Sequence, residues 1–228
     1  MAEPEKPHYL GHRERLRARF LAKGGGALSD YELLELLLCL AIPRRDVKPL
    51  AKALLARFGG FAEVIGAETS QLAAISGMGP AAVAALKSVQ AGAERLTRAQ
   101  VTKRPVLSNW QALLDYCRTA MAHQSREQFR VLFLNQKNML TADELLQEGT
   151  INHAPVYPRE VMRRALELGA AAIILVHNHP SGDPQPSRED IAMTKEIVEA
   201  GRRLGIAVHD HLVIGRHGHA SFKGLGLL

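Results

Sequence analysis

Apolar side chains in the first part of the chain recur every three to four residues, which is the spacing of amphipathic helices. Each helical pattern stops at glycine or proline, as helix ends commonly do. The predicted helices are residues 13–20 before a triple glycine, 33–42 after the capping-box pattern Ser29-Asp-Tyr-Glu32 and before Pro43, 47–58 before Gly59-Gly60, and two shorter ones on either side of Gly77-Met78-Gly79. Roughly the first 95 residues are therefore predicted to be helical.

A different pattern begins after a polar and basic segment, residues 96–105, which ends at Pro105 and is the predicted linker. Short apolar runs rich in branched and aromatic residues, typical of strands, alternate from there with helical patterns. The predicted strands are 129–134, 139–149, 171–176 and 206–214, and the predicted helices are 108–122, opened by a second capping box at Ser108-Asn-Trp-Gln111, then 157–168 and 188–204. These patterns predict a small all-α domain over residues 1–97 and an α/β (α+β) domain over residues 106–228.

The composition is that of a globular protein. The 228 residues are 46% hydrophobic, and no apolar stretch approaches the ~20 residues that cross a bilayer. The first residues lack the apolar core of a signal peptide. The two cysteines, Cys39 and Cys117, lie far apart and indicate neither a disulfide framework nor a thiolate metal site. We expect a reducing, cytoplasmic setting with no membrane association.

The stretch from His177 to Asp190 carries most of the recognisable chemistry. It reads His-Asn-His-Pro-Ser-Gly-Asp-Pro-Gln-Pro-Ser-Arg-Glu-Asp and directly follows the apolar run of residues 171–176. Because side chains alternate along a strand, His177 and His179 point the same way. Two imidazoles and the carboxylate of Asp190, with a fourth position left to water, form the ligand set of a catalytic zinc site. The sequence thus indicates metal-assisted hydrolysis.

Each part of this stretch also has an ordinary structural interpretation. Ser187-Arg-Glu-Asp190 is a normal helix start with Ser187 as the N-cap, and two histidines at alternate positions can simply be a polar strand end. The N-cap and metal-ligand interpretations are compatible, because a capped first turn holds an aspartate rigidly. The conjunction of a buried strand, two histidines, a Pro/Gly loop and an acidic helix start favours the metal site. Ser187, one turn before Asp190, is a candidate donor to a developing oxyanion.

The spacing His177-x-His179-x7-Ser187-x2-Asp190 is that of the JAMM signature of MPN-type metallopeptidases. The fuller string, together with Asp210-His-Leu-Val-Ile-Gly215 downstream, resembles the bacterial RadC family over nearly the whole chain. The resemblance implies a cytidine-deaminase-like MPN/JAMM domain with a central mixed sheet flanked by helices, preceded by a helical region with a helix-hairpin-helix. It further implies Zn²⁺ held by His177, His179 and Asp190, and cleavage of a peptide or isopeptide bond in a protein or peptide substrate.

The family pattern also includes a glutamate upstream, beside the first strand, that serves as the general base. Glu127, just before the predicted strand 129–134, is the better match, and Glu148 is the competing candidate. An ordinary solvated surface carboxylate is the alternative interpretation of either residue.

A second His-x-His pair, His209-Asp-His211, lies in the last predicted strand. Asp210 and His211 match the family, whereas His209 does not. Three roles stay open for Asp210 and His211: orienting a metal ligand through a hydrogen bond, ordinary packing, or direct ligation. His217 and His219 are expected to decorate a turn.

The turn Ile75-Ser-Gly-Met-Gly79, followed by an alanine-rich helix from Pro80 to about Gly92, resembles a helix-hairpin-helix. Backbone N–H groups in such a turn can bind a phosphate oxygen, so non-specific DNA contact through Gly77, Gly79 and Lys87 is one interpretation. Packing or protein docking is the other. The net charge of +6 permits nucleic-acid contact without requiring it. A run of alternating arginines could add phosphate contacts, although it also fits a solvated helix face: Arg13, Arg15, Arg17 and Arg19.

Three functions are compatible with these patterns. The first is a zinc metallopeptidase of the JAMM type, in which Glu127 activates water and Ser187 steadies the oxyanion. The second is a metal-dependent nuclease or other DNA-processing hydrolase, which is disfavoured because two-metal nucleases need more clustered carboxylates. The third is a DNA-binding, repair-associated protein whose metal is structural or lost, and the intact motif argues against it.

Overall fold

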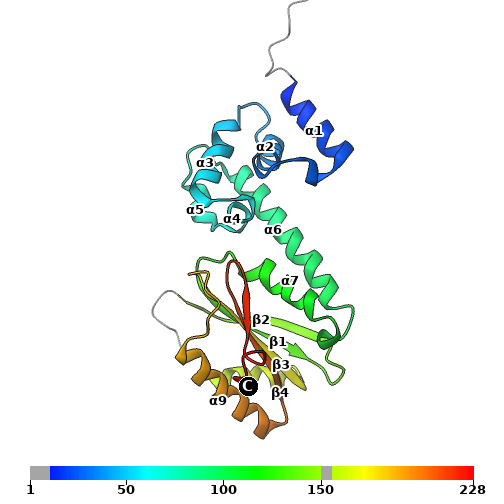
Figure 1. The fold of residues 1–228 in the computed structure, drawn as a ribbon, viewed down its shortest axis with the longest axis vertical. Coiled ribbons are helices and arrows are strands. Elements are labelled where there is room, and N and C mark those ends of the chain that lie inside the picture. The colour runs from blue at the N-terminus through cyan, green and yellow to red at the C-terminus, as the bar shows by residue number, and fades with distance from the viewer. Residues whose placement is uncertain (1–10, 150–155) are drawn as a thin grey trace, which may run out of the picture. The chain divides into compact units, whose positions relative to one another are not determined.

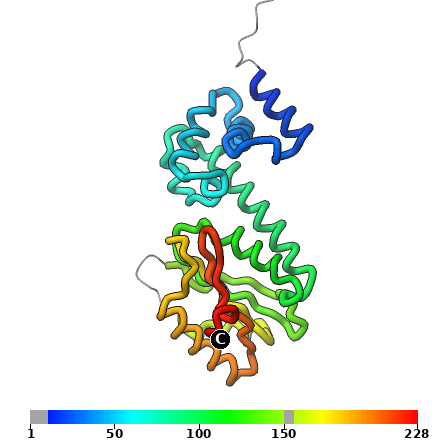
Figure 2. The backbone as a smooth tube through the Cα atoms, viewed as in Figure 1, coloured from blue at the N-terminus to red at the C-terminus, as the bar shows by residue number. Residues whose placement is uncertain are grey.

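The computed structural model describes residues 11–149 and 156–228, and the chain divides into two compact units between Gln90 and Ala91. The N-terminal unit is helical, as predicted (Figures 1 and 2). Its elements are α1 (His12–Lys23), the 3-10 turn η1 (Gly25–Ala27), α2 (Asp30–Ala41), α3 (Lys48–Phe58), α4 (Phe61–Gly66), α5 (Thr69–Ala73) and the first half of α6 (Pro80–Val101).

The helices of the N-terminal unit bury one apolar core. Its centre consists of leucines from four helices that are at most 1% exposed: Leu34, Leu38, Leu54, Leu72 and Leu86. The capping box predicted at Ser29 is present, because the Ser29 side chain accepts from the Glu32 N–H while the Glu32 side chain accepts from the Ser29 N–H. The N-terminal unit therefore has a hydrophobic core of its own.

Helix α6 is longer than the sequence pattern predicted. The prediction ended it near Gly92 and made residues 96–105 a linker, but the helix continues to Val101. The segment from residue 93 to 101 contains no glycine or proline and is rich in strong helix formers, so the helix tolerates the cost of Gly92, about 1 kcal/mol. Val101 is fully buried in the core of the C-terminal unit. The domain limits 1–97 and 106–228 stay predictions.

The C-terminal unit is built on a five-stranded mixed sheet with the order β2-β1-β3-β4-β5. Only β3 and β4 are parallel, and the other neighbouring pairs are antiparallel. The strands are β1 (Glu127–Leu134), β2 (Leu140–Gly149), β3 (Ala172–Asn178), β4 (Ala207–Ile214) and β5 (His219–Ser221). The predicted mixed sheet flanked by helices is confirmed. The three-residue β5 was missed because so short a segment has no readable periodicity.

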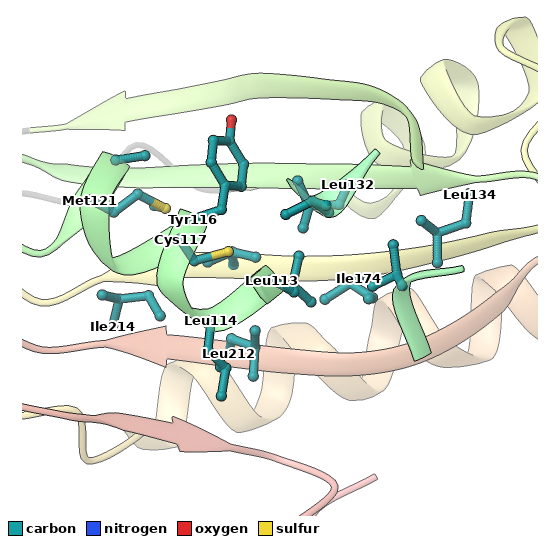
Figure 3. Close-up of a cluster of buried hydrophobic side chains, with 14 of the residues drawn as sticks. Leu113, Leu114, Tyr116, Cys117, Met121, Leu132, Leu134, Ile174, Leu212 and Ile214 are labelled. Carbon is teal, nitrogen blue, oxygen red and sulfur yellow. The ribbon is translucent and has the colours of Figure 1, made fainter. Parts of the chain in front are cut away.

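Alternation along the strands gives this sheet two buried faces. Helix α7 (Trp110–Met121) covers one face, where Leu132, Ile174 and Leu212 pack with the helix (Figure 3). Helices α8 (Pro158–Glu167) and α9 (Arg188–Leu204) cover the opposite face, whose cluster contains Phe129 and Leu175. In Figure 1, α7 and α9 lie on opposite sides of the sheet. The residues of β3 are all buried because both faces of the strand are covered.

The second capping box, predicted at Ser108, is wrong. Ser108 belongs to the 3-10 turn η2 (Val106–Ser108), and its hydroxyl donates to the Pro105 carbonyl at 2.8 Å. Helix α7 begins at Trp110, and no side chain caps it. A short polar residue can satisfy a local carbonyl as readily as a helix N–H, which the sequence pattern alone does not distinguish.

Within residues 11–149 and 156–228, no helix is both long enough and apolar enough to cross a membrane.

Candidate metal centre

Three side chains predicted as metal ligands lie together at one end of the sheet. His177 Nε2 is 3.0 Å from His179 Nε2, 3.4 Å from Asp190 Oδ1, and His179 Nε2 is 3.5 Å from Asp190 Oδ2. One ligand atom from each of the three residues lies within 4.8 Å of the others, which is the arrangement of a possible metal site. We call these residues the His-His-Asp cluster.

Local sequence explains how the cluster forms. His177 lies at the end of the fully buried strand β3, so its position is fixed by core packing on both sides. His179 follows in the loop, and its backbone N–H donates to the Ile214 carbonyl at 3.0 Å. Asp190 stands in the first turn of α9, where Ser187 Oγ accepts from the Asp190 N–H at 3.0 Å. The N-cap interpretation of Ser187 is confirmed, and it holds Asp190 in place.

Ser187 also contacts the carboxylate of Asp190. Its hydroxyl donates to Asp190 Oδ2 at 2.7 Å, and its backbone N–H donates to the same oxygen at 2.8 Å. The hydroxyl proton is therefore directed at the cluster, and a role as oxyanion donor requires the hydroxyl to turn away from Asp190.

The cluster stabilises a negative charge on Asp190. Burial raises the pKa of this carboxyl, but the neighbouring imidazoles of His177 and His179 and the hydroxyl of Ser187 outweigh burial and hold the pKa well below its usual range. The neighbouring carboxylate of Asp190 in turn raises the pKa of His179, and the nearby charge of Glu127 adds to that rise. The Asp190 carboxyl is therefore ionised and prepared to bind a cation.

The chemistry of the donor set fits a divalent metal. His179 Nδ1 lies 2.8 Å from the Asp183 carbonyl oxygen, which only accepts, so Nδ1 carries the proton and Nε2 presents its lone pair. That lone pair and the carboxylate oxygens of Asp190 converge on one point with His177 Nε2. Electron pairs that converge in this way are stabilised by a cation between them. Imidazole nitrogen and carboxylate oxygen are ligands that zinc accepts.

Strand register places the two candidate bases on opposite faces of the sheet. Phe129 is paired with His177 across β1 and β3, so Glu127, two residues earlier, shares the face of His177. Glu148 is paired with Gln128, whose side chain points to the other face. Glu127 therefore lies on the side of the cluster, in agreement with its electrostatic effect on His179.

His211 on β4 and Thr194 on α9 form hydrogen bonds with residues of the cluster. His211 is fully buried, and its Nε2 lies 2.8 Å from His177 Nδ1. Burial lowers the pKa of His211 well below its usual value. Thr194 Oγ1 lies 2.6 Å from His211 Nδ1. His211 thus has a hydrogen-bonding position beside a cluster residue, whereas Thr194 carried no signal in the sequence.

Asp210 has a different task. Its Oδ1 accepts from the backbone N–H groups of His211 and Lys223, and its Oδ2 accepts from the Ser221 hydroxyl. Asp210 therefore fastens β5 and the residues after it to strand β4, and none of these bonds reaches the His-His-Asp cluster.

Asn178 is a further residue that sequence reasoning missed. Its side chain is almost completely buried, accepts from the Gln128 N–H at 2.8 Å and donates to the Arg126 carbonyl at 3.0 Å. These bonds join the end of β3, between the two histidines, to the start of β1 on either side of Glu127. The signal in the sequence was its place between His177 and His179.

Among the residues that the structure describes, the His-His-Asp cluster includes none of the remaining histidines or cysteines. His209 Nε2 bonds to Asn138 Oδ1 at 2.7 Å, and His217 and His219 are exposed around the turn into β5. His219 is the first residue of β5 rather than part of the turn itself. Cys39 and Cys117 are both free thiols, as expected.

The predicted hairpin lies between α5 and α6, and Gly77 has the positive φ of +95° that favours glycine. Gly79 has open space around its Cα. The Lys87 ammonium donates to the Ile65 carbonyl at 3.2 Å and to Gln90 at 2.7 Å, so it ties α4 to α6. The cation at the turn is instead Arg45, whose Nη2 lies 3.5 Å from the Gly77 carbonyl oxygen.

The arginine run on α1 is partly engaged inside the N-terminal unit. Arg13 donates to the carbonyl of Ile42, the C-cap residue of α2, and to the carbonyls of Pro43 and Arg45 in the turn that follows, and Arg19 pairs with Glu32. Arg13 therefore acts as a cap for the carboxyl end of α2.

Two family models match the chain. Residues 107–227 match the model of the RadC-like JAB domain. Residues 8–84 match the model described as UPF0758 N-terminal.

Proposed function

Because this chain belongs to the RadC family, we propose that its JAB domain is a zinc-dependent hydrolase of the JAMM type that cleaves a peptide or isopeptide bond. The observation that carries the proposal is the His-His-Asp cluster, in which an ionised carboxylate and imidazole lone pairs meet at the end of a rigid strand. Three protein ligands with one position left open are typical of catalytic rather than structural zinc sites.

We assign a separate role in hydrolysis to each group of residues. His177, His179 and Asp190 would hold the metal, which when bound supplies a Lewis acid and a water whose pKa falls to about 7. Glu127, on the same face, takes the proton of the attacking water and returns it to the leaving amine. Ser187, after its hydroxyl turns from Asp190, donates a hydrogen bond to the oxyanion of the substrate.

A nuclease receives less support from this geometry. The cluster contains one carboxylate, and two-metal nucleases hold their ions with several. DNA contact through Gly77, Gly79 and Lys87 remains a separate proposal about the N-terminal unit. It rests on the turn, because the Lys87 side chain already bonds to Ile65 and Gln90.

The proposal is tested first by metal content. The full-length protein is expected to bind one zinc per chain, measured by elemental analysis after dialysis. His179→Ala and Asp190→Ala should lose that zinc because each removes a ligand. Glu127→Gln should keep it. Zinc retained by both ligand variants would contradict the site.

Activity is tested by comparing the new protein N-termini that each variant generates in a cell extract. Glu127→Gln should lower cleavage by roughly 10²–10⁴-fold, the usual contribution of a general base. Glu148→Gln is the matched control, and it should cleave normally because Glu148 faces the other side of the sheet. Cleavage that depends on Glu148 and not on Glu127 would show that the base is wrongly assigned.

A further inference from the structure

A network of three hydrogen bonds lies next to the His-His-Asp cluster. It runs from His177 Nδ1 to His211 Nε2 at 2.8 Å, from His211 Nδ1 to Thr194 Oγ1 at 2.6 Å, and from Thr194 Oγ1 to the Asp190 carbonyl oxygen at 2.6 Å. It begins at one proposed ligand and ends at another, and we call it the His211–Thr194 network. All four residues are buried, and His211 and Thr194 are at most 1% exposed.

We propose that His211 and Thr194 are positioning residues that hold His177 in the tautomer whose Nε2 lone pair faces the metal. The inference rests on the proposed metal site and adds to it the groups that prepare one ligand before the metal arrives.

Thr194 determines which atom donates and which accepts in each hydrogen bond of the His211–Thr194 network. Its hydroxyl has one proton, and the Asp190 carbonyl can only accept, so this proton is donated to Asp190. This contact is the usual bond of a helical threonine to the carbonyl four residues earlier. Thr194 Oγ1 must then accept from His211, which places a proton on His211 Nδ1.

The proton position on His211 determines which ring nitrogen of His177 carries a proton. A proton on His211 Nδ1 leaves Nε2 as an acceptor, because a charged imidazole in this apolar setting would need a carboxylate and the ring nitrogens meet only Thr194 and His177. The side chains of Phe222 and Phe129 pack against the His211 imidazole, and their ring centroids lie 4.5 and 5.7 Å from its centroid. His177 Nδ1 therefore donates to His211, and His177 Nε2 presents its lone pair to the cluster.

This arrangement also argues against His211 as a direct metal ligand. Both of its ring nitrogens are occupied, one by His177 and one by Thr194, so neither is available to a metal. The two histidines of the cluster are prepared separately. The Asp183 carbonyl fixes the tautomer of His179, and the His211–Thr194 network fixes the tautomer of His177.

Thr194→Val is the sharpest test, because valine has the shape of threonine without the hydroxyl. In the variant, His211 Nδ1 loses its acceptor and His211 can place its proton on Nε2, which would drive a proton onto His177 Nε2. We expect a loss of Zn²⁺ affinity of about 10–100-fold, measured by competition with a chelating dye. Thr194→Ser keeps a hydroxyl and should restore affinity to near that of the wild type.

The second readout needs no metal. Imidazole ¹⁵N chemical shifts of the metal-free protein, recorded at mildly alkaline pH, report which nitrogen of His177 carries the proton. We expect Nδ1–H in the wild type and in Thr194→Ser, and Nε2–H or a mixture in Thr194→Val. The backbone spectrum of the same sample checks that the variant is folded, and His211→Gln supplies a second variant if it is not.

The outcomes separate the two proposals. A wild-type protein that binds no zinc, but whose His177 is the Nδ1–H tautomer, would overturn the proposed function. It would still support the role of the His211–Thr194 network in fixing that tautomer. An Nε2–H tautomer of His177 in the wild type would overturn the role proposed for the His211–Thr194 network. Unchanged zinc affinity and an unchanged His177 tautomer in Thr194→Val would overturn it too.

Discussion

At the scale of single residues, the site depends on hydrogen bonds that orient each ligand atom. Spacing in the sequence was sufficient to predict that His177, His179 and Asp190 lie together, because a strand followed by a helix start brings such residues to one place. Thr194 carried no signal in the sequence, and the bonds that Asn178 makes were not predictable from its place between the two histidines. Their roles depend on partners 17 and 52 residues away along the chain, which only the folded structure brings into contact.

Ser187→Ala should reduce both stability and zinc affinity. The change removes the N-cap of α9, which costs about 1 kcal/mol, and it frees the carboxylate of Asp190 from a hydroxyl donor. Urea denaturation and zinc competition measure the two effects.

Ser29→Ala is the matched control for Ser187→Ala, since Ser29 forms the same capping box on α2 in the other unit. It should lower stability by a similar amount and leave zinc affinity unchanged. Equal zinc affinity in Ser187→Ala and the wild type would show that the cap does not position Asp190.

At the scale of elements, the site stands where three segments end or begin together. Strand β3 ends at Asn178, β1 begins at Glu127, and α9 begins at Arg188. The existence of these elements was predictable from apolar periodicity, and so was the order of strands and helices. The pairing of β1 with β3 was not, because strand register and neighbours depend on contacts that are remote in sequence.

Asn178→Ala should loosen this junction. The N–H of Gln128 and the carbonyl of Arg126 would lose their partner, which costs up to about 1–3 kcal/mol for the partly buried N–H. We expect reduced stability in urea and a fall in Glu127-dependent cleavage, because the start of β1 is no longer tied to the end of β3.

Asn109→Ala serves as the control for Asn178→Ala. Asn109 donates from its amide to the Gln100 carbonyl at an exposed site, where water can replace it. Its stability should change by less than that of Asn178→Ala. A stable Asn178→Ala variant with full activity would contradict the role assigned to the junction.

At the scale of the whole molecule, each unit has its own core, and the His-His-Asp cluster lies entirely in the C-terminal unit. The change from a helical pattern to alternating strands and helices made two units predictable. The position of the boundary was not, since a polar surface on α6 has the same composition as a linker and only the burial of Val101 distinguishes them.

Gly77→Ala should therefore destabilise the N-terminal unit without affecting the metal centre. Alanine at a φ of +95° is strained, at a cost of about 1 kcal/mol or more, and zinc affinity should stay that of the wild type. Gly79→Ala is the control, because Gly79 has open space and no positive φ, and it should be tolerated. A loss of zinc in Gly77→Ala would show that the units depend on each other.

X-ray absorption at the zinc edge of the full-length protein tests the central claim most directly. We predict one zinc with two imidazole nitrogens and one carboxylate oxygen at about 2.0–2.2 Å, the imidazole signal falling by half in His179→Ala if that variant retains any metal. Zinc held instead by exposed histidines such as His217 and His219, with the same spectrum in Asp190→Ala as in the wild type, would contradict the account.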